Sequence, residues 1–114
     1  MRIGAAAAAS GCHIETIRYY ERIGLLPHPA RSVSGYREYL PEEVDRLRFI
    51  TRGRELGFSL EEIRSLLALS DDPTLSCRDV DQLARHHLAD VRQRLRELRR
   101  IAQELERTIA SCAG

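Results

Sequence analysis

The stretch Ile14-Glu-Thr-Ile-Arg-Tyr-Tyr-Glu-Arg-Ile-Gly24 decides the fold of the N-terminal half of this 114-residue chain. Ile14, Ile17 and then Tyr20 or Glu21 recur at helical spacing, so one face of a short helix is predicted to be apolar. The remaining positions are polar, charged or aromatic and are predicted to face outward: Glu15, Thr16, Arg18, Tyr19 and Arg22. Gly24 and the two prolines that follow it end this helix.

The flanking segments complete a small helical domain. Ile3 to Ala9 are strong helix formers that stop at Ser10-Gly11, and Ser34-Gly35 is a turn signal inside a predicted hairpin, or wing, over residues 31–40. A third helix should run from Pro41 to Gly57, and the Ser-x-x-Glu spacing from Ser59 predicts a capping box at the start of a fourth. The third helix is expected to bury Val44, Leu47, Phe49, Ile50 and Leu56.

The C-terminal third has a different pattern. Residues 79–111 contain no Pro or Gly, and apolar residues alternate spacings of four and three: Ala84, Leu88, Val91, Leu95, Leu98, Ala102, Leu105 and Ile109. Such a heptad stripe, with Arg and Glu outside it, predicts a coiled-coil dimerisation helix; a helix packed on its own domain is the alternative. The chain should therefore be mainly α, with a domain over 1–70, a linker over 71–78 and a dimerisation helix over 79–114.

Composition and charge narrow the class of protein. Hydrophobic residues make up 43% and the net charge is +1, yet residues 1–40 hold five Arg against three Glu, so a local basic face is possible. No apolar run reaches the length of a membrane span and no signal-peptide core is present, which predicts a cytoplasmic protein without a membrane partner. We find no nucleophile paired with a base and no phosphate loop, so an enzyme is not expected.

Two of the three cysteines fall on the heptad stripe. Cys77 and Cys112 are 35 positions apart, five whole heptads, and therefore in phase. Along one helix they would be on the order of 50 Å apart, so a single chain cannot hold one ion between them. An antiparallel pair of helices would bring two thiols together at each end, whereas a parallel pair would match each cysteine with its own copy. Cys12 is out of phase and is predicted to be a packed thiol.

The residues quoted above resemble the DNA-binding domain of MerR-type regulators. The resemblance rests on Glu15 to Pro27, on Arg31, Gly35 to Arg37 and Tyr39, and on Arg54 to Leu60, and it extends over residues 3–112. It implies a winged helix-turn-helix in which the second helix enters the major groove of promoter DNA and the wing contacts the backbone. The expected DNA-binding residues are His13, Thr16, Arg18, Tyr19, Arg31, Tyr36 and Arg37. The pattern alone equally allows surface ion pairs of these arginines with Glu15, Glu21 and Glu38.

The same resemblance suggests a regulatory signal. It implies an antiparallel homodimer in which Cys77 and Cys112 are metal ligands, and whose distortion of promoter DNA lets bacterial RNA polymerase start transcription. The segment around Cys77 is most similar to the mercury group, so Hg(II) is expected first, then Cd(II), Pb(II) or Zn(II). A third Cys usual in the family after the position of Cys112 is missing from this chain, and two thiolates suit Hg(II). The alternatives are a same-fold sensor of oxidants or electrophiles, a metal-independent repressor and a coiled-coil adaptor.

Overall fold

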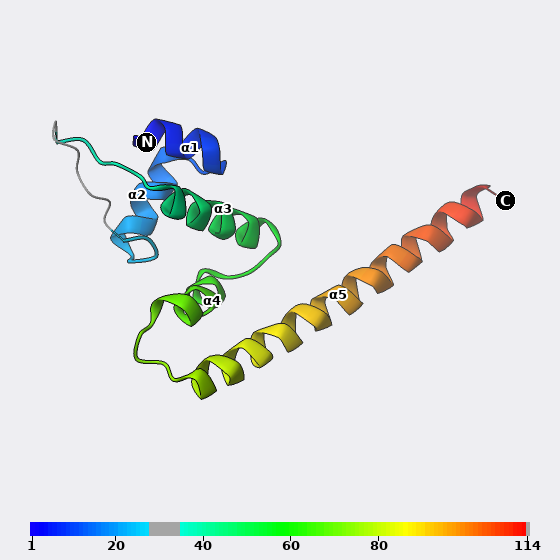
Figure 1. Ribbon diagram of the computed structural model, residues 1–114. Coiled ribbons are helices and arrows are strands. Elements are labelled where there is room, and N and C mark those ends of the chain that lie inside the picture. The colour runs from blue at the N-terminus through cyan, green and yellow to red at the C-terminus, as the bar shows by residue number, and fades with distance from the viewer. Residues whose placement is uncertain (28–34, 114) are drawn as a thin grey trace. The chain divides into compact units, whose positions relative to one another are not determined.

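The computed structural model describes residues 1–27 and 35–113 (Figure 1). They form five helices: α1 (Ile3–Ser10), α2 (Ile14–Arg22), α3 (Pro41–Glu55), α4 (Leu60–Asp71) and α5 (Cys77–Ala113). The chain divides into two compact units, Met1–Ser65 and Leu66–Gly114, which we call the head and the tail. The mainly α class is confirmed. In these two ranges no helix combines the length and the apolar character that crossing a membrane requires.

The head is built around a small apolar core to which every one of its helices contributes. α1 packs against α2 and α3. The buried apolar residues of the head are Ala6, Cys12, Ile17, Tyr20, Leu25, Leu26, Tyr39, Val44, Leu47, Ile50 and Ile63. A Cβ added at Gly53 of α3 would lie only 3.2 Å from Cδ1 of Ile63, so this glycine permits the close approach of α4 to α3. The predicted burial of Ile17 and Tyr20 on α2 is confirmed, whereas Ile14, predicted for the same face, is 37% exposed.

The predicted core face of the third helix is partly wrong. Val44, Leu47 and Ile50 are buried as expected, but Phe49 is 43% exposed and Leu56 is 65% exposed. The buried residues recur every three positions, while Phe49 follows Leu47 by two positions, which rotates it by about 200° around the helix. Phe49 and Leu56 thus lie on the opposite side of α3 from the head's core.

The short helices stop where the sequence indicated. α1 ends at Gly11, whose φ of 73° is left-handed and whose N–H bonds the carbonyl of Ala7. Gly24 has a φ of 76° just after α2. Only glycine adopts this conformation without strain, so the two glycines close α1 and α2 and turn the chain back onto the core.

Reciprocal capping starts the last two helices. Ser59 N donates to Glu62 Oε1 at 3.2 Å and Glu62 N donates to Ser59 Oγ at 3.1 Å, which confirms the predicted capping box of α4. Ser76 and Asp79 form the same pair of bonds at 3.2 and 3.1 Å. α5 therefore begins at Cys77, two residues earlier than position 79, because Ser76 is its N-cap.

Most of the apolar stripe of α5 is exposed in the single chain. Figure 1 shows α5 as one continuous helix, and no residue in its 37-residue length is buried. The large side chains of the stripe are exposed by 45–68%: Leu88, Leu95, Leu98, Leu105 and Ile109. A single stripe of this length, left open to water, is typical of a helix that pairs with a second helix.

The wing falls only partly within the described residues. Arg31 and the predicted turn at Ser34 lie outside them. The described part, residues 35–40, contains one isolated bridge residue, Arg37, and no strand. Tyr39 and Met1 exchange two backbone hydrogen bonds, of 2.7 and 2.9 Å, so this segment runs beside the start of the chain.

Candidate nucleic-acid interface and thiol pair

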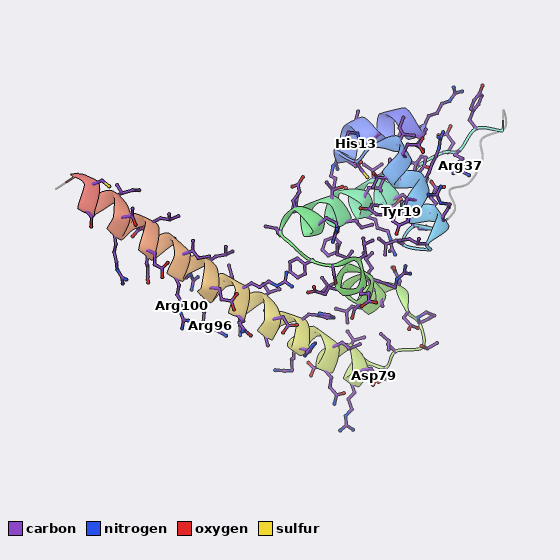
Figure 2. The ribbon with its side chains drawn as sticks, turned by 180° about the vertical axis from the view of Figure 1, so that it is seen from behind. His13, Tyr19, Arg37, Asp79, Arg96 and Arg100 are labelled. Carbon is purple, nitrogen blue, oxygen red and sulfur yellow. The ribbon has the colours of Figure 1, made fainter. Side chains whose placement is uncertain are left out.

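The outer face of α2 presents the side chains predicted for it. His13 is the N-cap residue, Arg18 and Tyr19 are exposed, and Thr16 is half-buried, while Ile17 and Tyr20 point into the core. Figure 2 labels His13 and Tyr19 on the head, together with Arg37 from the 35–40 segment. A polar and aromatic helix face next to a chain segment that carries further cations can meet base edges and phosphates together.

Arg18 makes an ion pair that leaves its guanidinium group exposed on the surface. Its Nη1 lies 2.9 Å from Oε1 of Glu15, and the two side chains are 51% and 80% exposed. An exposed pair one helical turn apart is weak because water competes for both groups. The surface ion pair considered as an alternative therefore exists, but it does not remove the cation from the surface.

Arg37 pairs with Glu21, one of the carboxylates that the sequence allowed as an ion-pair partner, but Glu21 is buried and not on the surface. Arg37 Nη1 donates to Oε2 of Glu21, and the Tyr39 hydroxyl donates to Oε1 of the same side chain. Glu21 is only 3% exposed. Burial, and then the neighbouring Glu21, raise the pKa of Tyr39 to about 12. We call these three residues the Glu21 triad; it fixes the 35–40 segment to α2.

A sequence signal for the Glu21 triad was present. Glu21 follows Ile17 by four positions, which places it on the apolar face of α2. A carboxylate on such a face needs a cation and hydrogen-bond donors, because an unpaired buried charge is costly. The position of Glu21 thus indicated a partner, although not which one.

Two further arginines hold the chain that leaves α2. Arg46 Nε of α3 donates to the carbonyl of Leu25 at 2.9 Å, and Arg64 Nη2 of α4 donates to the carbonyl of Ile23 at 2.8 Å. Charge-assisted bonds of this kind satisfy carbonyls that the end of a helix leaves unpaired. They fix the C-terminal end of α2 from two later helices, and the sequence analysis did not identify them.

Cys77 and Cys112 are both exposed free thiols on α5, one at its first residue and one next to its last. Within the part of the chain that the structure describes, no three side chains of His, Cys, Asp and Glu gather closely enough to hold a metal ion. Soft divalent metals prefer thiolates, and two thiolates can satisfy the low coordination number of Hg(II). The donor type fits such an ion, and a site that uses both positions needs a second copy of α5.

Cys12 has a different environment. It is 6% exposed in the core of the head, and burial raises the pKa of its thiol. A thiol with a raised pKa in apolar surroundings is a poor nucleophile and a poor ligand. Cys12 is a packed residue, as predicted.

Known proteins resemble this chain along its whole length. The family model described as MerR HTH family regulatory protein matches residues 1–70, and the model described as MerR, DNA binding matches residues 44–108. A "Probable heavy metal-dependent transcriptional regulator" of Haemophilus influenzae is 42% identical over 114 residues, which cover 100% of this chain and 89% of the relative. A mercuric resistance operon regulatory protein of Bacillus cereus is 45% identical over 91% of this chain and 79% of its own.

A solved structure agrees with these relatives. The lead(II) complex of a transcription regulator from Ralstonia metallidurans superposes with a TM-score of 0.61 at 45% identity, covering 92% of this chain and 81% of that one. Together the two family models match residues 1–108, which include all of α1 to α4 and most of α5. The chain belongs to the MerR family of helix-turn-helix transcriptional regulators.

Proposed function

We propose that this protein binds promoter DNA as a homodimer and switches transcription by distorting that DNA in response to a soft divalent metal. Hg(II) is the first candidate, followed by Cd(II), Pb(II) and Zn(II), and bacterial RNA polymerase is the partner on the promoter. The observation that carries this proposal is the placement of two exposed thiols at the two ends of α5, in phase with its mostly exposed apolar stripe. The relatives named for heavy metals and mercury support the same class of ion.

The two possible helix orientations bring different residues together. In a parallel pair, each residue that precedes the stripe lies near the residue five positions later in the partner. This would place Arg94 against Arg99 of the partner subunit, and His87 against Arg92 of the partner subunit. Arg94 and Arg99 would repel each other, because both side chains are cations. An antiparallel arrangement brings Cys77 near Cys112 of the partner subunit, so each end offers two thiolates.

The thiolates define what an effector ion would contact. Cys77 and Cys112 of the partner subunit would hold the ion. The bound ion would then join the two subunits through their thiolates. Only the deprotonated thiol is a ligand, so loading the site releases protons. An effect on DNA at a distance requires that metal-bound and metal-free dimers differ in the DNA geometry they favour.

Arg18→Ala tests the DNA-binding half of the proposal. The duplex is selected from a random-sequence pool by the wild-type protein, and affinity is measured by fluorescence anisotropy over a range of salt concentrations. We expect Kd to rise by about 5- to 100-fold and the slope of log Kd against log salt to become shallower, since a contact with a base or phosphate is lost. Arg100→Ala, an arginine that Figure 2 shows on α5, is the control and should bind like wild type. An unchanged Kd and slope for Arg18→Ala would remove α2 from the interface.

A second function is favoured by one observation, the exposure of both thiols as free cysteines. Exposed thiols can also react with oxidants or electrophiles. In that case, alkylation or disulfide formation would change DNA affinity at a constant metal content. Measuring DNA binding of metal-free protein before and after treatment with iodoacetamide separates this function from metal sensing.

A further inference from the structure

A basic hollow lies at the edge of the α2 surface. It has a volume of about 670 Å³ and is lined by the first turn of α1, by one residue of α2 and by the described part of the wing: Arg2, Ile3, Gly4, Ala5, Arg18, Gly35, Tyr36 and Arg37. Three of the lining residues are arginines and none is acidic, although Arg18 also pairs with Glu15 and Arg37 with Glu21 outside the lining. We call it the α1 hollow. Its lining favours an anion.

Arg2 is held in this hollow by an aromatic ring. Its Cζ lies 4.0 Å from the centroid of Tyr36, which is the distance of a cation–π contact. The stacked guanidinium uses its flat face for the ring and keeps its N–H groups at the edge for an acceptor. Tyr36 is itself 55% exposed. Arg2 and Tyr36 therefore orient each other at the rim without using the donors of Arg2.

The first turn of α1 adds backbone donors to the same hollow. Arg2 is the N-cap of α1 and gives no side-chain cap, and the first intrahelical bond is from Ala6 N to the carbonyl of Arg2 at 2.9 Å. The N–H groups of residues 3–5 have no hydrogen-bond partner within residues 1–27 and 35–113. The first turn contains no acidic residue. The positive end of the helix dipole thus faces a hollow lined with arginines.

Gly4 leaves the backbone of this turn open. A Cβ added at Gly4 would have no heavy atom within 4 Å. A ligand oxygen can therefore approach the amides of the first turn without displacing a side chain, as phosphates do at helix N-termini.

We propose that the α1 hollow binds one phosphate of the DNA backbone, with Arg2 as its principal side-chain contact. This rests on the proposed function, because Arg18 lines both the hollow and the α2 face that we assign to the major groove. In this arrangement the ligand of the hollow is a DNA phosphate, and it belongs to the strand whose bases α2 contacts. α1 then becomes a third contact element beside α2 and the wing, and it fixes the register of the head on the duplex.

Arg2→Ala is the first test, with the selected duplex described above and with Arg100→Ala as the matched control. We expect Kd to rise about 5- to 10-fold and the slope of log Kd against log salt to fall by about one, since a single phosphate contact is lost. Arg2→Lys keeps the charge and loses the planar fork, and should lie between wild type and Arg2→Ala. Circular dichroism should be unchanged, because Arg2 is exposed.

Single neutral methylphosphonate linkages, placed in turn along the duplex, locate the contact. Wild type should lose affinity at one specific linkage in each half-site, and Arg2→Ala should be insensitive to that linkage alone. If both proteins respond equally at every linkage while Arg18→Ala still weakens binding, the α1 hollow is not a DNA phosphate site and the proposed function stands. If the wild type selects no duplex from the pool, the proposed function itself fails.

A titration with inorganic phosphate tests whether the ligand of the hollow is a free phosphate ion and not a phosphate of the DNA backbone. Titration of the metal-free dimer, followed by phosphorus NMR, should show no saturable binding that depends on Arg2 at low millimolar concentration. Saturable binding lost in Arg2→Ala, with DNA affinity unaffected by that substitution, would reassign the hollow to free phosphate and overturn the proposal.

Discussion

Replacing Cys77 by serine is expected to remove the two Hg(II) ions that the wild-type dimer retains in the presence of an excess of a competing thiol. In the proposed antiparallel dimer each end would contain one Cys77 and one Cys112 from the partner subunit, so this substitution would leave a single thiolate at each end. A hydroxyl is a hard donor that does not replace a soft thiolate. The affinity should fall at least about 100-fold, since even an outer-shell partner of a metal ligand is worth roughly 10- to 100-fold.

The measurement is a Hg(II) titration of reduced protein, monitored by thiolate-to-metal absorption, together with metal analysis of the dimer after dialysis against the competing thiol. Cys12→Ala is the control, because Cys12 is buried in the head and should leave both the absorption and the stoichiometry unchanged. Full stoichiometry in Cys77→Ser would refute the thiol pair as the metal site. Cys112→Ser should lose Hg(II) binding in the same way as Cys77→Ser. A mixture of the two variants should regain one metal site in each heterodimer.

Replacing Leu98 by glutamate is expected to separate the dimer and, with it, to remove binding to a duplex with two half-sites. Leu98 lies near the middle of the apolar stripe and is 59% exposed in the single chain. Loss of a buried leucine costs about 2–5 kcal/mol in each subunit. The introduced carboxylate would also have to be buried without a cation assigned to it. The dissociation constant of the dimer should therefore rise by well over about 100-fold, as 1.4 kcal/mol corresponds to tenfold.

Sedimentation equilibrium over a concentration series gives the mass of each variant, and anisotropy gives its DNA affinity. Gln103→Glu makes the same change of charge on the outer side of α5, one position beyond the stripe, and should remain dimeric. A Leu98→Glu protein that stays dimeric would show that the stripe is not the dimer interface. The head of the Leu98→Glu protein should keep its helices, because Leu98 is not part of the core of the head.

The sequence predicted the features that depend on local chemistry. Ser59 and Glu62 predicted a capping box because the two bonds form between residues three apart, and Gly11 predicted a helix end because its left-handed φ suits glycine alone. The long apolar stripe of α5 is likewise visible as spacing. The start of α5 at Cys77 depends on Ser76 as its N-cap, and the prediction for Phe49 was wrong because it rested on hydrophobicity and not on the angle of Phe49 around α3.

The sequence did not predict the features that depend on tertiary proximity. Glu21 meets Arg37 and Tyr39 across 16 and 18 positions, and Arg64 reaches Ile23 across 41. Arg2 and Tyr36 meet only because the start of the chain runs beside residues 38–40. A periodic pattern in the sequence does not reveal these contacts, because each depends on how separate elements pack. The residues that line the α1 hollow were therefore only partly found, and Arg2 was missed.

The Glu21 triad constrains how this sequence can change during evolution. Loss of Arg37 or Tyr39 alone would leave a carboxylate that is 3% exposed with an unused oxygen, and loss of Glu21 alone would strand its two partners. Joint replacement by apolar side chains of similar volume would carry no such penalty. Positions 21, 37 and 39 are therefore expected to covary as a set among relatives. Natural selection would then preserve the contact between α2 and the 35–40 segment.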